Sequence, residues 1–463
     1  MTAARELAEL ARALDWDALG EPVRERGREL LLDHLAVAFD GQGTDSARAV
    51  RNVVGSTGGG SARVIGTPLT ADPAWAALAN GAAAHARELD DCDRESSLHP
   101  GVAVIPAALA MAEDRDADVA SLIAAIVAGY EVTMRAGAAL NPASAYARGF
   151  HPTGVAGVFG AATAAGRLLE LDTDRLVAAL GIAGTMASGS LEYLSDGSWT
   201  KRLNPGWSAH AGVVAARLAA EGHSGPATVF DGPLGVLRAH SDAPDLERLT
   251  AGLGGPLQIL RVAIKPYACC RYSHGVIDCM LGLRAEHGLH AEQVEELDLG
   301  VLSHASRLVA EPIEAKRRPR TIVDAQFSAP FAAAVALVHG GAGPERYTEA
   351  ALEDEELREL MSRTSCHHSE ELDRRYPDCM PASVSARLKD GQVLRASIDF
   401  PLGEPENPLS RSALIARFGA LAGPALGEDE AVEIASELLS VDAGAKVRTA
   451  LASMTAIRRA DWT

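Results

Sequence analysis

Long apolar stretches of helical length alternate with short polar or glycine-rich breaks over the first 260 residues. Runs such as RELLLDHLAVAFDG, VASLIAAIVAGYEVTMRAG and DRLVAALGIAGTMASGSLEYL are apolar on nearly every side of a helix. A helix of that kind is buried among other helices rather than laid on the surface of a sheet. Residues 1–265 are therefore predicted to form a large, all-helical domain.

The pattern changes after Pro266. The segments EELDLGVLSHASRLV and SVSARLKDGQVLRASIDFP alternate apolar and polar positions and contain β-branched residues, which is typical of strands. Asp390-Gly391 predicts a hairpin turn within the second segment. The segments DAQFSAPFAAAVALVHG and TEAALEDEELRELMSRT, which lie between them, have helical patterns. Residues 266–403 are predicted to form a smaller α+β domain.

Helical periodicity returns at the end of the chain. The segments NPLSRSALIARFGALAG and GEDEAVEIASELLS follow PLGEPENP, a stretch rich in proline and glycine that we interpret as a linker. Residues 404–463 are predicted to rejoin the helical domain. The expected fold class is mainly α, with a large helical domain and a smaller α+β domain.

The net charge of the chain limits the kinds of molecule that it can bind. The chain has 43 Lys and Arg against 62 Asp and Glu, a net charge of -19 that repels nucleic acid and anionic membranes. It contains no run of about 18 uninterrupted apolar residues and begins without the apolar core of a secretory signal. Its 6 cysteines are too few for a disulfide scaffold. We expect a cytoplasmic protein without nucleic-acid or membrane partners.

Two apolar helical runs open with a His-Pro pair. They are SLHPGVAVIPAALAMA and FHPTGVAGVFGAATAA, which place His99 and His151 directly before Pro100 and Pro152. Proline is well tolerated in the first turn of a helix, so both histidines are expected at helix N-termini. Because free N–H groups at a helix start attract anions, these positions suit a negatively charged ligand.

Two more runs place titratable side chains in the same way. SHGVIDCMLGL puts His274 before a third helix, and TKRLNPGWSAHAGVVAAR puts Lys201 and Arg202 just ahead of a fourth, which we expect to open at Asn204-Pro205. An acidic protein that binds a polyanion needs a local group of cations and helix starts of this kind. Histidine near its ordinary pKa is suited to acid–base catalysis there.

Four segments, in this order and spacing, resemble the MmgE/PrpD family: HARELDDCDRESSLHPGVAVIPAALA, GFHPTGVAGVFGAATAAGRLL, DGSWTKRLNPGWSAHAG and YACCRYSHGVID. The similarity spans nearly the whole chain. The family includes 2-methylcitrate dehydratase, cis-aconitate decarboxylase and iminodisuccinate epimerase. The resemblance implies a helical domain with an α+β lid domain, usually dimeric, that acts on small di- and tricarboxylates without a cofactor or a metal.

The resemblance also implies which residues act. His99, His151, Lys201 and His274 match the catalytic and carboxylate-binding positions, and we add Asp91 because it or Asp90 can orient His99. We expect substrate-binding roles for residues in or beside the same motifs: Glu88, Asp90, Cys92, Arg202, Cys269, Cys270 and Tyr272. Since His274 belongs to the α+β part and the others to the helical part, the site is expected in a cleft between the domains.

The sequence departs from better-known members of the family at two places. It has Glu88-Leu89-Asp90-Asp91-Cys92 where many members have Asp-Phe-Asp-Asp-Thr, and it has a double cysteine at 269 and 270. A thiol beside a catalytic histidine can act as a second acid–base group, as a two-base epimerase requires. The alternative is that both thiols are buried and inert.

Other residues with chemical potential are assigned no function. Cys366-His367-His368 with Cys379 lacks the spacing of a zinc site, and STGGGSARVIG lacks the order of a phosphate-binding loop. Five further histidines have no matched catalytic position and are interpreted as structural or surface residues: His85, His210, His287, His290 and His304.

We expect a cofactor-independent lyase of the 2-methylcitrate dehydratase type, which moves a proton next to a carboxylate and expels water. The first alternative is an epimerase or isomerase of a small dicarboxylate, followed by a decarboxylase of the cis-aconitate type. A carboxylate-binding protein without catalytic activity is the alternative outside the enzymes. A homodimer joined through the helical domain is also expected, because its helices are apolar on too many faces for one subunit to cover.

Overall fold

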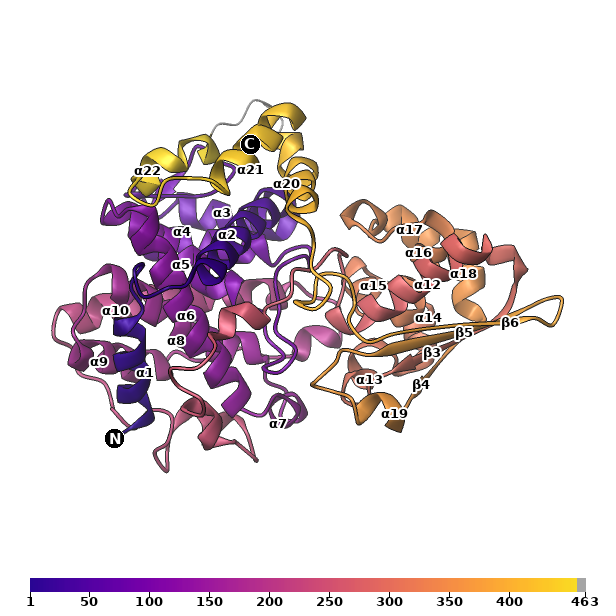
Figure 1. Cartoon of the computed structure of the whole chain (residues 1–463), viewed down its shortest axis with the longest axis horizontal. Coiled ribbons are helices and arrows are strands. Elements are labelled where there is room, and N and C mark those ends of the chain that lie inside the picture. The colour runs from indigo at the N-terminus through magenta and orange to yellow at the C-terminus, as the bar shows by residue number, and fades with distance from the viewer. Residues whose placement is uncertain (456–463) are drawn as a thin grey trace.

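The computed structural model describes residues 1–455 as two domains side by side, a helical body and an α+β domain (Figure 1). The fold is mainly α, as the sequence predicts. The last part of the predicted C-terminal segment, residues 456–463, lies outside the described residues.

The helical body is built from the N-terminal half of the chain. Its helices are α1 (Ala3–Ala13), α2 (Glu21–Gln42), α3 (Asp45–Gly55), α4 (Pro73–Ala84), α5 (Gly101–Asp114), α6 (Val119–Ala139), α7 (Pro142–Ala147), α8 (Pro152–Leu168), α9 (Thr173–Gly184), α10 (Thr200–Ala220) and α11 (Val236–His240). Helices α4, α5, α6, α8 and α10 are buried on most of their faces, which is the arrangement that their apolar patterns predict.

Small residues allow the central helices to approach one another closely. A Cβ atom on Gly160 of α8 would lie 1.7 Å from Thr133 Oγ1 and 2.4 Å from the carbonyl oxygen of Gly129, both on α6. Any side chain at Gly160 would therefore force the two helices apart. This close packing explains why the apolar helical runs are so rich in alanine and glycine.

Among residues 1–455, α6 is the one helix long and apolar enough to cross a membrane by length and composition. Its 18-residue apolar window is 89% buried inside the structure. Neighbouring helices, chiefly α8 and α5, cover this surface, so the apolar composition of α6 is accounted for by the core of the body.

The helix starts largely follow the sequence. Helix α8 begins at Pro152 with His151 as its N-cap, and α5 begins directly after Pro100. Helix α10 differs from the expectation, because it begins at Thr200 and contains Pro205 in its interior. The prediction that this helix opens at Asn204-Pro205 is wrong by about one turn, and Lys201 lies inside the first turn rather than upstream of it.

The α+β domain has a four-stranded sheet in the order β4-β3-β5-β6. Its strands are β3 (Val294–Val301), β4 (Thr364–His368), β5 (Ala382–Leu388) and β6 (Val393–Ile398); β4 is parallel to β3 and the other pairs are antiparallel. Strands β5 and β6 form the predicted hairpin, in which Gly391 has a φ of 92°. That left-handed backbone conformation favours glycine.

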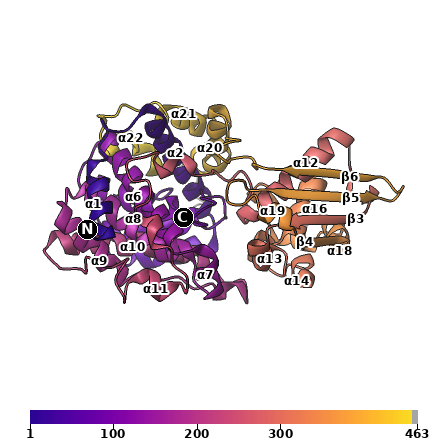
Figure 2. The same ribbon diagram turned by 60° about the horizontal axis from the view of Figure 1, so that its bottom comes forward.

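Helices cover one side of this sheet and fill the connections (Figure 2). Helix α12 (His274–His287) contacts β5 and β6, and α16 (Ala329–His339) packs against α12 and α18 (Glu355–Ser362). The shorter helices are α13 (Ser303–Val309), α14 (Ile313–Arg317), α15 (Ile322–Gln326), α17 (Glu349–Glu353) and α19 (Glu370–Asp373). In addition, β1 (Ala62–Arg63) and β2 (Thr70–Ala71) form a small ladder in the body.

The chain returns to the helical body after the sheet, through α20 (Arg411–Leu426), α21 (Glu428–Leu438) and α22 (Val447–Ala450). Helix α20 packs against α2, where Phe418 meets Phe39 and the Arg417 guanidinium lies 2.7 Å from Asp33. Arg417 also donates a hydrogen bond of 2.9 Å to the carbonyl oxygen of Leu89. This C-terminal helix thus supports the loop that follows α4.

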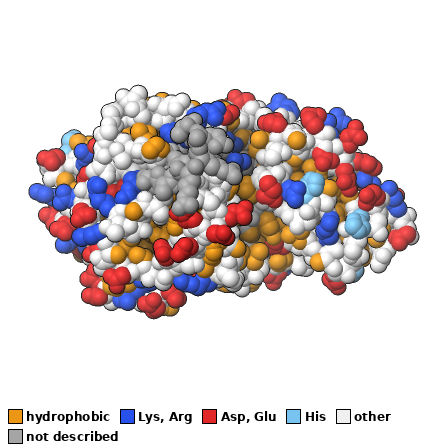
Figure 3. Space-filling view, turned by 90° about the horizontal axis from the view of Figure 1, so that it is seen from above, with side chains coloured by type: hydrophobic (Ala, Val, Ile, Leu, Met, Phe, Trp, Pro, Cys, Tyr) orange, Lys and Arg blue, Asp and Glu red, His pale blue; other side chains and the backbone are white. Residues whose placement is uncertain are grey.

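Acidic and basic side chains are interspersed on the face of the molecule seen in Figure 3, over both domains. A surface of mixed sign differs from the broad basic face that binds nucleic acid. The charged side chains that could take part in chemistry lie in the interior instead.

Candidate active site

A cavity lies between the helical body and the α+β domain. The charged and acid–base side chains in its wall are Glu88, Cys92, Asp93, Arg94, His99, Tyr146, His151, Tyr193 and Lys201 from the body, and Cys270, Arg271 and Tyr272 from the α+β domain. Both domains therefore contribute to one site.

The loop after α4 crosses the floor of this site and pairs with residues 262–265. The N–H of Cys92 donates to the carbonyl oxygen of Ala263 (2.9 Å), and the N–H of Ala263 donates to that of Cys92 (2.7 Å). Glu88 in this loop has a φ of 58°, a strained conformation that costs about 1–3 kcal/mol and requires support from its surroundings. The pairing brings Lys265 beside the loop's carboxylates.

Two buried lysines neutralise these carboxylates. The Lys201 ammonium pairs with Glu88 Oε1, while Lys265 Nζ lies 3.4 Å from Glu88 Oε2 and 3.8 Å from Asp90 Oδ1. Burial alone would raise the pKa of Glu88, but Lys201 and Lys265 outweigh it and hold that pKa below its usual range. Burial lowers the pKa of Lys201, and Glu88 opposes this shift. Glu88 and Lys201 thus form a buried ion pair at the edge of the cavity.

Three histidines cluster where three helix ends of the body meet. His85 ends α4, His99 precedes α5 and His151 caps α8. The ring centroids of His85 and His99 lie 4.9 Å apart, those of His85 and His151 6.0 Å, and those of His99 and His151 6.4 Å. His99 and His151 line the cavity, and His85 lies buried behind them.

Asp90 fixes the proton of two of these rings. Its Oδ2 lies 2.9 Å from Nδ1 of His85 and 2.9 Å from Nδ1 of His99, and the latter also lies 2.9 Å from the carbonyl oxygen of Asp91. Carboxylate and carbonyl oxygens only accept hydrogen bonds, so each Nδ1 carries a proton, and the neutral ring of His99 keeps its lone pair on Nε2. Burial lowers the pKa of His99 to about 4, with Asp90 opposing. His99 is therefore uncharged at neutral pH.

His151 has the opposite arrangement. The side-chain Nδ2 of Asn204 lies 3.3 Å from His151 Nδ1 and donates to it, so the proton of the neutral ring is on Nε2. Burial and then the Lys201 ammonium hold the pKa of His151 well below its ordinary value. The cavity thus receives a hydrogen-bond donor from His151 and an acceptor from His99.

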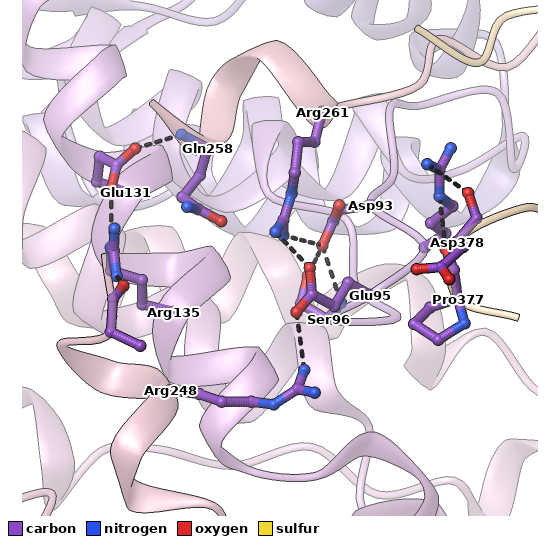
Figure 4. A network of polar contacts seen from close by, with 12 residues as sticks. Asp93, Glu95, Ser96, Glu131, Arg135, Arg248, Gln258, Arg261, Pro377 and Asp378 are labelled. Carbon is purple, nitrogen blue, oxygen red and sulfur yellow. Dashed lines mark hydrogen bonds and ion pairs between the residues drawn. The ribbon is translucent and has the colours of Figure 1, made fainter. Parts of the chain in front are cut away.

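Arginines of the body hold the loop 93–98, which leads into His99 (Figure 4). Arg261 pairs with Glu95 and lies 3.3 Å from Asp93, and Arg248 Nη1 lies 2.8 Å from Glu95 Oε1. In the same network, Arg94 donates to the carbonyl oxygens of Pro377 (2.9 Å) and Asp378 (3.0 Å) in the α+β domain. This loop is therefore fixed to both domains.

Residues 270–272 supply the polar side chains of the α+β wall of the cavity, and Leu308, Phe327 and Met380 supply its apolar part. The Tyr272 hydroxyl lies 2.9 Å from Ser97 Oγ of the body, which links the two domains at the cavity. Arg271 is buried and its Nη2 lies 2.6 Å from Glu404 Oε1. Since Tyr272 bonds to Ser97 and Arg271 to Glu404, Cys270 is the remaining polar side chain of residues 270–272 at the cavity.

Comparisons with known proteins match both parts of the chain that line the cavity. Residues 5–249 match the MmgE/PrpD N-terminal domain, and residues 267–441 match the MmgE/PrpD C-terminal domain. The chain belongs to the MmgE/PrpD family. The C-terminal match extends beyond the sheet into α20 and α21, although those helices pack on the helical body.

Curated relatives match over most of their length. The chain is 29% identical over 461 residues to a cis-aconitate decarboxylase of Aspergillus terreus, covering 94% of this chain and 92% of the relative. It is 28% identical over 451 residues to the cis-aconitate decarboxylase-like protein oryM of Aspergillus oryzae, covering 93% and 92%. The human cis-aconitate decarboxylase is 27% identical over 430 residues, covering 89% and 86%.

Five residues of this MmgE/PrpD protein that were predicted to act at the site lie outside the cavity wall: His274, Arg202, Cys269, Asp90 and Asp91. His274 is fully buried at the start of α12, where its Nδ1 accepts from Arg271 Nη1 at 2.9 Å. Its Nε2 lies 3.3 Å from the carbonyl oxygen of Cys269, whose own thiol is also buried. Arg202 points to Ser46 Oγ at 3.2 Å. His274 thus braces the chain that carries Cys270, rather than facing the cavity.

Asp91 and Asp90 support the site from behind its wall. Asp91 Oδ1 accepts from the N–H of Gly101 (2.9 Å), and its Oδ2 accepts from the Tyr130 hydroxyl (2.6 Å). Burial raises the pKa of Asp91 to about 7, and the Tyr130 hydrogen bond opposes this. The structure therefore assigns the contact with His99 to the Asp90 carboxylate and only to the main-chain carbonyl of Asp91.

Sequence reasoning missed His85 and Lys265. His85 precedes Glu88 within the first motif, but it was interpreted as structural because no matched position implied a role. Lys265 lies in the otherwise apolar run VAIKPYACC, and a lysine there signals a buried charge that needs a partner. That signal was available in the sequence.

The histidine cluster is also the place where a metal could bind among residues 1–455. One ligand atom from each of His85, His99 and His151 lies within 4.8 Å of the others. Zinc–nitrogen bonds of about 2.0–2.1 Å in a tetrahedral site require nitrogens about 3.4 Å apart, so the cluster would have to contract. The nearby ammonium groups of Lys201 and Lys265 also repel a dication. The residues fit acid–base chemistry better than a metal.

Proposed function

We propose that this protein is a cofactor-independent lyase that decarboxylates an unsaturated tricarboxylate of the cis-aconitate type. The observation that carries the proposal is the buried Glu88–Lys201 pair beside neutral His99 and His151, in a cavity between two domains. The names of the relatives support the choice of decarboxylation.

The site is suited to bind a polyanion within an acidic protein. Lys201 lies in the first turn of α10, where its charge adds to the partial positive charge of the helix start. His151 adds a neutral Nε2–H donor. A substrate carboxylate can pair with Lys201 and this donor in place of part of the contact with Glu88, while Lys265 continues to neutralise Glu88 and Asp90.

Decarboxylation requires that the site stabilise the electron pair of the broken C–C bond and that one proton be added to the product. When the carboxylate on the methylene carbon of cis-aconitate leaves as CO2, the electrons of the broken C–C bond form a new terminal double bond. The original double-bond pair moves to the outer carbon and is delocalised into its carboxylate. Lys201 and the His151 donor stabilise this enediolate in a site that excludes bulk water. One proton added to the outer carbon completes the product.

From the sequence alone, dehydration is the first expectation, epimerisation the second and decarboxylation the third. Dehydration and epimerisation both begin with removal of a proton, for which the His99 Nε2 lone pair is the available base. Decarboxylation requires no such base for its first step. The relatives, which are named as decarboxylases or as decarboxylase-like, favour the reaction that begins with loss of CO2.

NMR in deuterated water separates these reactions. The purified protein is incubated with cis-aconitate, 2-methylcitrate and simple hydroxydicarboxylates in parallel. We expect cis-aconitate to give CO2 and a methylidene dicarboxylate that contains one deuterium, with no deuterium in the recovered substrate. Loss of water from a hydroxy acid, or deuterium exchange without loss of CO2, would overturn the proposal.

A further inference from the structure

In the proposed reaction, one carbon atom of the substrate takes up a proton in each turnover. The source of that proton can be inferred from the groups of the cavity wall, and this inference rests on the proposed function. The neutral histidines do not supply this proton readily. His99 has a pKa of about 4 because it is buried, and burial and Lys201 hold the pKa of His151 well below its ordinary value. Both are uncharged at neutral pH, and a neutral imidazole releases its remaining proton only to a very strong base.

The other hydroxyl and ammonium groups of the cavity are also poor donors to carbon. Burial raises the pKa of Tyr193 well above its ordinary value, and it does the same for Tyr272. Lys201 is engaged with Glu88, and its charge is required while the enediolate forms. Burial also raises the pKa of Tyr146, and it raises the pKa of Cys92, the other thiol of the cavity wall, to about 12. The carboxylate of Asp93 is held by Ser96 and Arg261. Cys270 is the remaining candidate donor in the cavity wall.

Cys270 is linked to the helical body through Gln326 of the α+β domain. Its N–H donates to the carbonyl oxygen of Gln326 at 2.8 Å, and the Gln326 side chain donates to the carbonyl oxygen of Arg87 at 3.1 Å. Arg87 directly precedes Glu88 in the loop of the body. The cysteine is thereby tied to the loop that carries the carboxylate partner of Lys201.

The surroundings of Cys270 stabilise its thiolate once the proton has left. Burial raises the pKa of the thiol, so it carries a proton at neutral pH; the Tyr272 N–H, Lys265 and Lys201 act in the opposite direction. The Glu88 carboxylate favours the protonated form, as burial does. A group that holds its proton at rest and has cations and an N–H beside it is suited to donate that proton.

The neighbouring thiol provides a contrast within the same dipeptide. Cys269 is fully buried and lies outside the cavity wall, with its thiol near the Tyr347 hydroxyl. The backbone turns between the two residues, so one thiol faces the packed interior of the α+β domain and the other the cavity. The double cysteine therefore contains its own matched control.

We propose that the Cys270 thiol is the catalytic acid that protonates the outer carbon of the enediolate. The S–H bond breaks as the C–H bond forms, and the sulfur keeps the electron pair as a thiolate. The thiolate regains a proton from solvent after the product leaves, so no oxidant or reductant is consumed. The proton reaches the carbon from the α+β side, away from the three histidines of the body.

The test uses the intact protein with cis-aconitate in deuterated water and measures two quantities, the turnover rate and the handedness of the CHD group in the product. The wild-type protein is measured first. If it releases no CO2, the proposed function fails, independently of any role for Cys270. If it does, Cys270→Ser, Cys270→Ala, Cys269→Ser and Lys201→Arg are compared with it at equal folded fraction.

We expect Cys270→Ser and Cys270→Ala to lose at least about a hundredfold in kcat and to give a product of mixed handedness, because water then protonates the carbon from either side. Cys269→Ser should keep the rate within a few-fold and a single handedness. A single handedness at an undiminished rate in Cys270→Ala would overturn the assignment. Mixed handedness in Lys201→Arg but not in Cys270→Ser would overturn it too, because the lysine would then be the donor.

Discussion

His99 and His151 face one cavity with their ring centroids 6.4 Å apart and carry their protons on opposite nitrogens. The carboxylate of Asp90 places the proton of His99 on Nδ1, and the amide of Asn204 leaves the proton of His151 on Nε2. One wall of the cavity therefore offers both an acceptor and a donor without a positive charge.

Replacing Asp90 should disturb this arrangement. In Asp90→Asn the amide can donate as well as accept, so His85 and His99 are no longer held in one tautomer, and Lys265 loses an anionic partner. We expect a loss of about a hundredfold in kcat. The ring ¹⁵N shifts of His99 should change from the Nδ1-protonated pattern to a mixture. An unchanged tautomer in the variant would contradict the role assigned to Asp90.

Asp91 should make stability depend on pH in an unusual direction. Burial raises its pKa in the folded protein to about 7, above the value of 3.8 in an unfolded chain. Its contribution to the free energy of unfolding is therefore fully present below about pH 4 and is lost as the pH rises through about 7. Asp91→Asn cannot ionise, so its deficit relative to wild type should be largest at pH 4–5 and shrink toward pH 8.

Urea unfolding of both proteins across this range measures that difference. A deficit that grows as the pH rises would show that the buried carboxylate is ionised in the fold. Asp242→Asn is a suitable control, since Asp242 pairs with Arg148 on the surface. Its deficit should change little with pH, because exposed pairs contribute less than about 1 kcal/mol.

His274 should act through the chain that it braces. His274→Ala removes the link between Arg271 and the carbonyl oxygen of Cys269. We expect a decrease in kcat of at least about tenfold and a loss of about 1–3 kcal/mol in stability, because a buried guanidinium N–H is left without its partner. His210→Ala is the control, since His210 stacks on Trp207 and contacts Trp75 outside the cavity wall, and it should keep turnover within a few-fold. Wild-type turnover in His274→Ala would contradict this role.

The general architecture could be predicted from the sequence, because buried helices such as α6 and α8 have apolar residues on nearly every face. That pattern is visible in the sequence itself. The sheet was predictable because β5 and β6 alternate and are joined at Asp390-Gly391. The start of α10 was not, because a proline inside the first turns of a helix looks like a helix start. Nothing in the local pattern shows that Thr200 already begins the helix.

The candidate site could be predicted only where a residue stands in a recognisable motif. Lys201, His99 and His151 were found in this way and line the cavity. The role of His274 could not be resolved, because the sequence does not show that the chain turns between residues 269 and 270. Lys265 reaches Glu88 through a pairing of residues about 170 positions apart, which no local pattern encodes.

Activity is expected to survive removal of metals. The site supplies cations from Lys201 and Lys265 and hydrogen bonds from histidines that are too widely spaced for tetrahedral zinc. The test is turnover after prolonged treatment with a strong chelator and gel filtration. Loss of turnover that a single added metal restores would show that the three histidines bind an ion in the active protein.

An apolar stripe along the start of α10 is the expected dimer contact. Trp199, Leu203 and Trp207 are spaced four residues apart and are 48%, 40% and 43% exposed, so they share one face of the helix. In a dimer with a two-fold axis through this stripe, the stripe of one subunit packs against the same stripe of the other subunit. We expect a dimer by sedimentation at micromolar concentration and a monomer for Trp207→Glu. A monomeric wild-type protein, or a Trp207→Glu variant that stays dimeric, would exclude this contact.

The most direct test of the account is the release of CO2 from cis-aconitate by wild-type protein, Lys201→Met and Arg202→Met. Lys201 pairs with Glu88 in the cavity, whereas its neighbour Arg202 points to Ser46 outside it. Using ¹³C-labelled substrate, we expect one equivalent of ¹³CO2 per methylidene product from the wild type. Lys201→Met should lose at least about a hundredfold in rate, and Arg202→Met should stay within a few-fold. No ¹³CO2 from the wild type, or equal losses in the two variants, would contradict the account.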